Sequence, residues 1–179
     1  MKHTTKKVLT IILVIAVVVS VLKAYEVIFL DSAVPKAIIV RYVKKNASAL
    51  EDLPYAEYAQ EQGDRVLGSD EATGFIERHI GSSPRAFRID AIMMEDASGK
   101  PVSEFDDIEF IVFHCRKPFL TITSEYTRFY YSKSGAPYTY DQGNLTETSP
   151  GVFECNDNGH VVRQEKITGN WYYHYEAWN

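Results

Sequence analysis

The feature that most constrains this chain is an uninterrupted apolar run close to its start. Val8 to Leu22 contains no charged side chain, and only Thr10 and Ser20 in it are polar. The run is preceded by Lys2, Lys6 and Lys7. A helix of fifteen residues spans about 22 Å, so it must extend to Leu30 to cross a hydrocarbon core of about 30 Å. We therefore predict a transmembrane helix, with the lysines holding its N-terminus in the cytoplasm.

The same start also has the charged region and apolar core of a cleaved signal peptide. Cleavage needs small residues at positions −3 and −1, and the nearest option, ending at Ala24, has Leu22 at −3. This mismatch favours an uncleaved signal anchor. We expect a single-pass cell-membrane protein, with residues 1–30 as cytoplasmic stub and anchor and residues 31–179 as an extracytoplasmic domain. The membrane is the partner that we expect for its N-terminal helix.

The charge of the expected domain argues against a nucleic-acid partner. Four of the 19 basic residues and one of the 24 acidic residues lie before residue 31, which leaves fifteen basic and twenty-three acidic residues, a formal charge of −8. An acidic surface gains nothing from counterion release on a polyphosphate. With 179 residues, 45% of them hydrophobic, the chain has material for one domain.

Helical periodicity comes first along the chain. One stripe with spacings of three and four residues contains Ile39, Val43, Ala47, Leu50 and Leu53. It predicts a helix beginning near Pro35. Two shorter helices are predicted at residues 54–62 and 70–80, the second capped by Ser69 and ended by Gly81.

Beyond Pro84 the period changes to two, which is typical of strands. The predicted strands cover residues 87–93, 108–115, 119–123, 126–132, 152–155, 160–167 and 171–178. We therefore predict an α+β fold: an N-terminal transmembrane helix, two or three short helices, then a mainly antiparallel sheet of about six strands.

Short aromatic motifs near the C-terminus carry a family resemblance. They are Phe129-Tyr130-Tyr131-Ser132, Ala136-Pro137 and the segment Ile167 to Tyr173. Together with the anchor, this part resembles a group of small signal-anchored bacterial envelope proteins of unknown function. Arg128 departs from that group, in which a glycine often precedes the aromatic pair. The resemblance implies bacterial origin and envelope location, and it implies no catalytic residue.

Aromatic side chains are the main binding signal. Neighbours in a strand face opposite ways, so Trp171 and Tyr173 share one face while Tyr172 and His174 share the other. We expect one of these rows to lie outside the core, where exposed rings suit a protein, a peptide or a cell-wall sugar. Cross-strand packing that only stabilises the sheet is the alternative. The candidate binding residues are Tyr130, Tyr131, Trp171, Tyr173 and Tyr175.

Two sets of residues in the sequence have the composition of a metal site. Glu154, Asn156, Asn158 and Glu165 occupy positions 1, 3, 5 and 12 of a calcium loop, but strands flank them and a hairpin turn explains the same residues. Zinc ligands could come from His114, Cys115, Cys155, His160 and His174. Since adjacent strand residues point to opposite faces, the first two cannot both bind one ion. We expect no metal and no cofactor.

The two cysteines, Cys115 and Cys155, leave two alternatives open. An exported domain permits a disulfide between them, whereas a domain of this kind also buries free thiols readily.

No nucleophile elbow and no papain-like cysteine signature occurs in the sequence. We therefore expect noncatalytic binding of a protein or cell-envelope component. One alternative is an envelope hydrolase, in which His114 or His174 would meet an acid and a hydroxyl. Another is a structural subunit of a membrane complex.

Overall fold

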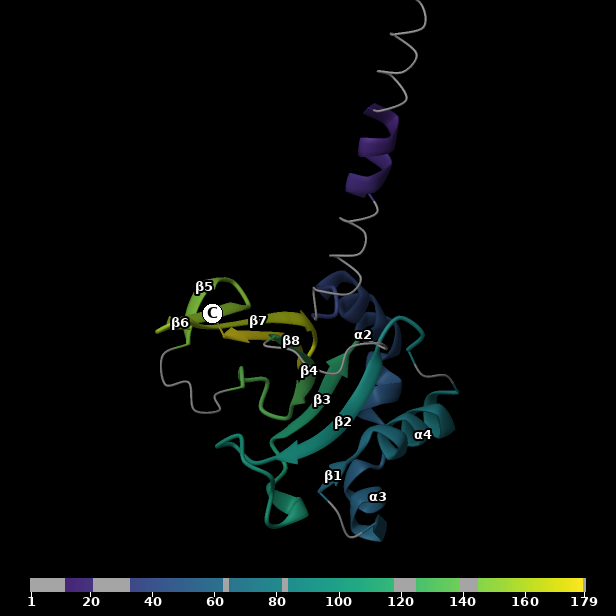
Figure 1. Ribbon diagram of the computed structural model, residues 1–179. Coiled ribbons are helices and arrows are strands. Elements are labelled where there is room, and N and C mark those ends of the chain that lie inside the picture. Colours follow the sequence, from purple (N-terminus) through teal and green to yellow (C-terminus); the bar gives the residue numbers. More distant parts are fainter. Residues whose placement is uncertain are drawn as a thin grey trace, which may run out of the picture. The chain divides into compact units, whose positions relative to one another are not determined.

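The computed structural model describes residues 12–20, 33–62, 65–81, 84–117, 125–138 and 145–178. The chain divides into two compact units, Met1–Ser32 and Ala33–Asn179. The second unit is an α+β domain with three α-helices and one eight-stranded sheet (Figure 1). The α+β class and the placement of the helices before most of the strands are confirmed.

The N-terminal part of the fold prediction needs a correction. Within the described ranges, no helix is long and apolar enough to cross a membrane. Of the predicted transmembrane segment the structure describes a helix of residues 12–20, which spans about 14 Å against a hydrocarbon core of about 30 Å. The rest of the segment, residues 8–11 and 21–30, lies outside the described residues. For what is described, the predicted transmembrane helix is wrong.

The three helices of the domain form where the periodicity predicts them. They are α2 (Lys36–Glu51), α3 (Tyr55–Gln62) and α4 (Ser69–Ile80). The buried residues of α2 include Ile39 and Val43 from the predicted stripe. The cap of α4 is Gly68, one residue before the predicted Ser69, and its backbone N–H donates to Glu71 Oε2 at 3.1 Å. The helix ends at Gly81, whose φ of 83° is the left-handed conformation that glycine adopts without strain.

The strands form a single sheet in the order β1-β2-β3-β4-β8-β7-β6-β5, with every neighbouring pair antiparallel. Their bounds are β1 (Val66–Leu67), β2 (Arg88–Glu95), β3 (Phe110–Arg116), β4 (Glu125–Ser132), β5 (Thr146–Ser149), β6 (Val152–Asp157), β7 (His160–Thr168) and β8 (Trp171–Trp178). A short 3-10 helix, Phe105–Asp107, precedes β3.

The expected number of about six strands is too low. The two strands that the sequence misses, β1 and β5, form the two edges of the sheet. β1 has only two residues, and all four residues of β5 are exposed, so neither shows an alternating apolar pattern. The predicted strand at residues 119–123 lies outside the described residues.

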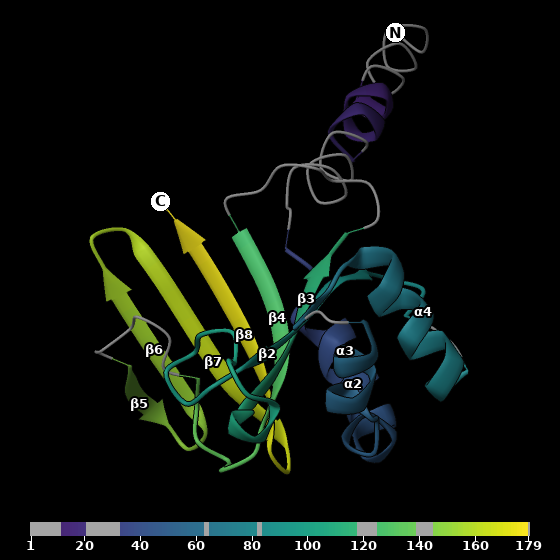
Figure 2. The same ribbon diagram turned by 90° about the horizontal axis from the view of Figure 1, so that it is seen from below.

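The sheet buries side chains on both faces. The helices gather on one side of it (Figure 2), and this helix-covered face holds Phe113, Phe129, Trp171 and Tyr173 together with the buried residues of α2 and α4. The opposite face, here called the second face, holds a smaller cluster of Phe110, Val112, Tyr130, Tyr138 and Tyr172. The two faces receive alternate residues of the same strands.

Candidate functional site

The aromatic residues predicted for binding are largely interior. Four of them, Tyr131, Trp171, Tyr173 and Tyr175, belong to the helix-covered face, and Tyr130 belongs to the second face. Trp171, Tyr130 and Tyr173 are 0%, 1% and 5% exposed, and the other two are half-buried. These rings therefore pack across strands and build the sheet's two clusters.

Both rows of β8 are buried, contrary to the expectation that one row lies outside the core. The buried residues are Trp171, Tyr172, Tyr173 and His174. The second face is covered because Tyr138, which follows β4, packs on it, with its ring 5.1 Å from Phe110 and 6.0 Å from His174. In the described part of the domain, the exposed large aromatic side chains are Tyr126 (44%) and Trp178 (57%).

The β6–β7 hairpin contains the four residues weighed as a calcium loop: Glu154, Asn156, Asn158 and Glu165. Its turn places Asn158 and Gly159 at φ values of 49° and 86°, as a tight hairpin requires. Arg163 donates to both carboxylates, at 2.7 Å to Glu154 and 2.6 Å to Glu165. Glu165 also pairs with Lys36, so two cations offset the two carboxylates. No group of three or more His, Cys, Asp or Glu side chains in the described ranges is placed to hold a metal ion.

Cys115 and Cys155 are free thiols in the structure. They lie on β3 and β6, which are four strand spacings or roughly 19 Å apart in the sheet. A disulfide requires Cα atoms within about 7 Å. Of the two alternatives from the sequence, the structure has the free thiols. Burial raises the pKa of Cys115 well above its ordinary value, which disfavours the reactive thiolate.

A group of ionisable side chains on the second face is a stronger candidate site. It comprises His114, Arg128, His160, His174 and Glu176, and we call it the histidine–arginine cluster. Register brings its members together: His114 on β3 is opposite Arg128 on β4, which is opposite His174 on β8. Directly opposite residues of antiparallel strands share a face, so these three side chains form one row across the sheet.

Glu176 is the carboxylate at the centre of the cluster. Its Oε2 lies 3.2 Å from the Arg128 guanidinium and 3.5 Å from His174 Nε2. Its Oε1 lies 3.0 Å from His160 Nε2. The His160 ring also stacks on Trp178 at 3.9 Å between ring centroids. The cluster thereby connects to Trp178, an exposed aromatic ring.

Burial and neighbouring charges determine the protonation states of the cluster at neutral pH. Burial, followed by the nearby Arg128 charge, lowers the pKa of His114 to about 3. Burial also lowers the pKa of His174. The contact with His174 and the charge of Arg128 lower the pKa of Glu176 to about 2. At pH 7 the cluster therefore holds one guanidinium, one carboxylate and at least two neutral imidazoles.

Several buried nitrogens of the row have no hydrogen-bond partner among the residues that the structure describes. They are His114 Nε2, Arg128 Nε and His174 Nδ1, while His174 Nε2 makes only the 3.5 Å contact with Glu176 Oε2. Gln164, the next residue of the same row, is by contrast fully used: it accepts from the Tyr138 backbone N–H at 3.0 Å and donates to the Tyr138 carbonyl at 2.7 Å. Since burying an unpartnered polar group costs about 1–3 kcal/mol, such groups point to a role other than folding.

The sequence pointed to the three histidines of this cluster but not to its two other members. His114, His160 and His174 were weighed as zinc ligands, while Arg128 and Glu176 were missed as site residues. A signal was present: Arg128 and Glu176 are charged residues inside strands whose other residues are mainly aromatic. Knowing that they share a face with the histidines required the strand order, in which β4 and β8 are neighbours although far apart in sequence.

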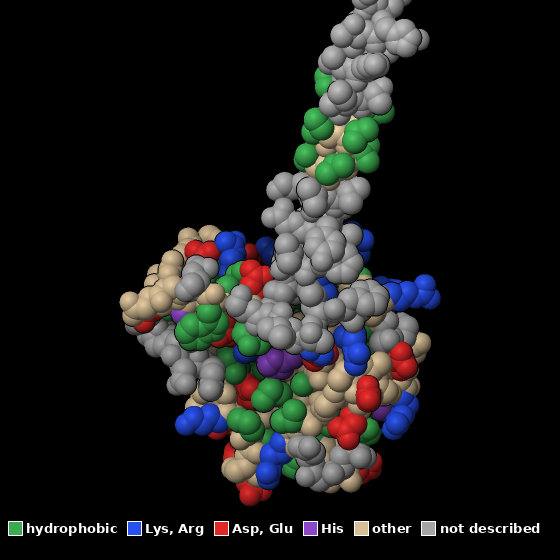
Figure 3. Space-filling view, in the orientation of Figure 1, with side chains coloured by type: hydrophobic (Ala, Val, Ile, Leu, Met, Phe, Trp, Pro, Cys, Tyr) green, Lys and Arg blue, Asp and Glu red, His purple; other side chains and the backbone are tan. Residues whose placement is uncertain are grey.

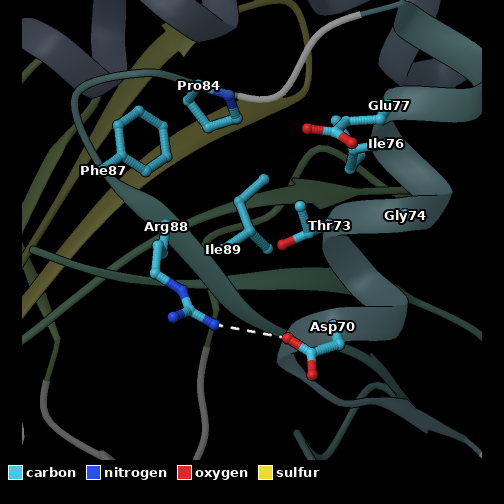
Figure 4. A pocket seen from close by; sticks show the side chains of 9 residues that line it. All are labelled: Asp70, Thr73, Gly74, Ile76, Glu77, Pro84, Phe87, Arg88 and Ile89. Atoms are coloured by element: carbon cyan, nitrogen blue, oxygen red, sulfur yellow. Dashed lines mark ion pairs between the residues drawn. The ribbon is translucent and has the colours of Figure 1, made fainter. Parts of the chain in front are cut away.

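A pocket of about 420 Å³ lies between α4 and β2 (Figure 4). Its lining residues are Asp70, Thr73, Gly74, Ile76, Glu77, Pro84, Phe87, Arg88 and Ile89. In Figure 4 the Arg88 guanidinium points to Asp70, at 3.7 Å. None of these lining residues holds a buried polar atom without a partner. The pocket therefore has no buried polar atom that a ligand would satisfy, whereas the histidine–arginine cluster has several.

Comparison of the chain with protein-family models, with curated proteins and with solved structures finds no match.

Proposed function

We propose that residues 33–179 form a noncatalytic binding domain, and that the histidine–arginine cluster is its binding site for a protein or cell-envelope partner. The observation that carries the proposal is the row of buried nitrogens on His114, Arg128 and His174 that have no hydrogen-bond partner in the described part of the chain. A fold under selection for stability alone replaces such groups by apolar ones, because that change is close to neutral or stabilising.

The surroundings of the cluster support contact with a partner. The side chains of Arg128, His160 and Glu176 are 15%, 17% and 13% exposed to solvent, so the cluster reaches the surface. Tyr126 and Trp178, the exposed rings, lie on the same face at the end of the sheet where β4 begins and β8 ends. Aromatic rings beside polar groups are typical of binding surfaces. Figure 3 shows histidine, basic and hydrophobic side chains side by side on one face of the molecule.

Hydrolysis is the alternative from another class, and part of what it requires is present. His174 lies beside the acid Glu176, as a general base lies beside the group that orients it. A hydroxyl or thiol nucleophile is also needed. In the described ranges, no serine, threonine or cysteine donates a hydrogen bond to His114, His160 or His174. Binding without covalent chemistry therefore fits the cluster better.

The test is partner capture by the intact chain with a matched pair of variants. Wild type, His174→Phe and Arg163→Gln are crosslinked in cells, extracted in detergent and compared by mass spectrometry. We expect a partner that is held by wild type and by Arg163→Gln, whose arginine lies on the hairpin with Glu154 and Glu165, and that is lost from His174→Phe. Equal recovery with all three chains contradicts the proposal.

Location outside the cytoplasm belongs to the same proposal and rests on the first thirty residues, whose lysine-rich start and apolar run have the composition of a secretory signal. Protease added to intact spheroplasts is expected to digest the domain. Protection of the domain, under conditions in which an exported control protein is digested, contradicts this location.

A further inference from the structure

The nitrogens of the cluster that lack protein partners define the kind of group that can bind there. Arg128 Nε is a hydrogen-bond donor at every pH, since the guanidinium is not deprotonated in proteins. His114 Nε2, opposite it across β3 and β4, donates in one of the two tautomers of a neutral imidazole. A group that bridges these two nitrogens must therefore accept hydrogen bonds. An amine or a metal cation would instead meet the positive charge of Arg128.

The arrangement of Arg128 leaves one edge of its guanidinium for such a group. Its terminal nitrogen is engaged by Glu176 Oε2 at 3.2 Å, while Nε is buried without a partner. A group with two acceptor oxygens, such as a carboxylate, can accept one hydrogen bond from Arg128 Nε and another from the neighbouring imidazole. A single carbonyl oxygen is less well suited to accept both.

The charges of the cluster favour a group with a single negative charge. Arg128 and Glu176 cancel each other, so a dianion such as a phosphate ester would face the carboxylate with no net positive charge to offset it. His174 can supply one more positive charge when its ring takes up a proton, with Glu176 on one nitrogen and the ligand on the other. The groups that face His174 are Arg128, His114, His160, Glu176 and Tyr138.

We propose that His114, Arg128 and His174 bind a carboxylate, carried by a ligand whose apolar part contacts the exposed rings of Tyr126 and Trp178. This inference rests on the proposed binding function and names its ligand class. Tyr126 is opposite Glu176 across β4 and β8, and Trp178 is two residues beyond it on β8, so both rings border the row. Binding takes up a proton on His174, because a carboxylate at Nδ1 and Glu176 at Nε2 both need an N–H.

The test uses defined probes on the full chain, followed by calorimetry and by NMR of nitrogen-labelled histidines. The probes are phenylacetate, its neutral analogue phenylacetamide, inorganic phosphate, and a short peptide ending in phenylalanine with a free or an amidated C-terminus. We expect phenylacetate to bind at least tenfold more tightly than phenylacetamide and than phosphate. Between pH 8 and pH 6 its affinity should rise by up to tenfold per pH unit. Tighter binding of the free peptide than of phenylacetate identifies a peptide as the source of the carboxylate.

Two variants connect the binding to the cluster. His114→Phe and Arg128→Gln should each weaken phenylacetate binding at least tenfold, whereas their controls His79→Phe on α4 and Arg163→Gln on the hairpin should not. If Arg128→Gln fails to fold, His114→Phe carries the test alone, because it removes only an imidazole with no hydrogen bond at Nε2.

Equal binding of acid and amide, tighter binding of phosphate, or unchanged affinity in His114→Phe each overturns the carboxylate assignment. Absence of binding by every probe overturns it as well. The binding function itself still stands in those cases if the captured partner is lost from His174→Phe, so the two proposals fail separately.

Discussion

The two faces of the sheet use the same strands in different ways. On the helix-covered face, Phe113 and Phe129 stack at 4.4 Å between ring centroids and both lie within 6 Å of the Trp171 ring. The second face has an aromatic half around Tyr130 and Tyr172, stacked at 5.1 Å, and then changes to the histidine–arginine cluster.

The difference between the faces lies in their polar atoms. Of the buried side-chain atoms without a hydrogen-bond partner in the described ranges, the helix-covered face has the Tyr42 hydroxyl, and a second oxygen, Asp90 Oδ1, lies on β2. The cluster has three such nitrogens and a fourth, His174 Nε2, with only a 3.5 Å contact to Glu176. Apolar packing on the first face stabilises the fold, and the unpartnered groups on the second lower the stability. Proteins retain destabilising buried polar groups mainly where a functional site requires them.

The largest effect is expected from the helix-covered face. Phe129→Ala removes a ring that is 0% exposed and should lower the free energy of unfolding by about 3–5 kcal/mol. Tyr126→Ala, on the same strand but 44% exposed, is the control and should change it by about 0.5 kcal/mol or less. Urea unfolding of the three chains at pH 7 measures both. Similar losses of unfolding free energy in the two variants would contradict the distinction between a buried and an exposed aromatic side chain.

Lowering the pH should reduce the stability of the domain through the buried histidines of the second face. The pKa of His114 is about 3 in the folded chain and has its ordinary value of 6.5 in the unfolded chain. The unfolded chain therefore binds a proton that the folded chain does not, so stability is complete above pH 6.5 and falls as the pH drops toward 3. Near pH 5, His114 contributes a slope of about 1.3 kcal/mol per pH unit. The lowered pKa of His174 acts in the same direction.

The measurement for this effect is urea unfolding between pH 4.5 and pH 6.5. His114→Phe should lose about 1.3 kcal/mol per pH unit of the slope that wild type shows, while His79→Phe on α4 should keep it. The carboxylates contribute equally to all three chains, so they cancel in the comparison. An unchanged slope in His114→Phe means that this histidine titrates alike in the folded and unfolded chains.

The smallest effect concerns the pocket beside α4. A Cβ on Gly74 would have no atom within 4 Å, so Gly74→Ala fits without a clash. The change should stabilise the helix by about 1 kcal/mol, because glycine is the poorer helix former. Thermal unfolding measures it, and unchanged partner capture by this variant would show that the pocket is not the binding site. Loss of the partner would move the site to the helix-covered side.

Local sequence patterns predicted much of the domain. The stripe with Ile39 and Val43 located α2, and period-two alternation located most of the strands, because both depend on residues close in sequence. Edge strands β1 and β5 were missed, since a strand pairs on one side only at an edge and needs no apolar alternation there. The apolar run near the start predicted a transmembrane helix, which the described residues do not contain.

The candidate site depended on information that local patterns do not hold. His114, Arg128 and His174 meet only because β8 inserts beside β4 in the sheet, a pairing of distant segments. The burial of Tyr172 and His174 depended in turn on Tyr138 folding over the second face. Alternation along β8 correctly separated Tyr172 from Tyr173, but it could not show that both sides would be covered.

The most direct test of the account is the stability of the double variant His114→Phe/His174→Phe, measured by urea unfolding at pH 7. If the two histidines serve binding, replacing them by rings of similar shape should leave the free energy of unfolding within about 1 kcal/mol of wild type or raise it. A loss as large as that of Phe129→Ala would show that the cluster holds the fold together, and would contradict its assignment as a binding site.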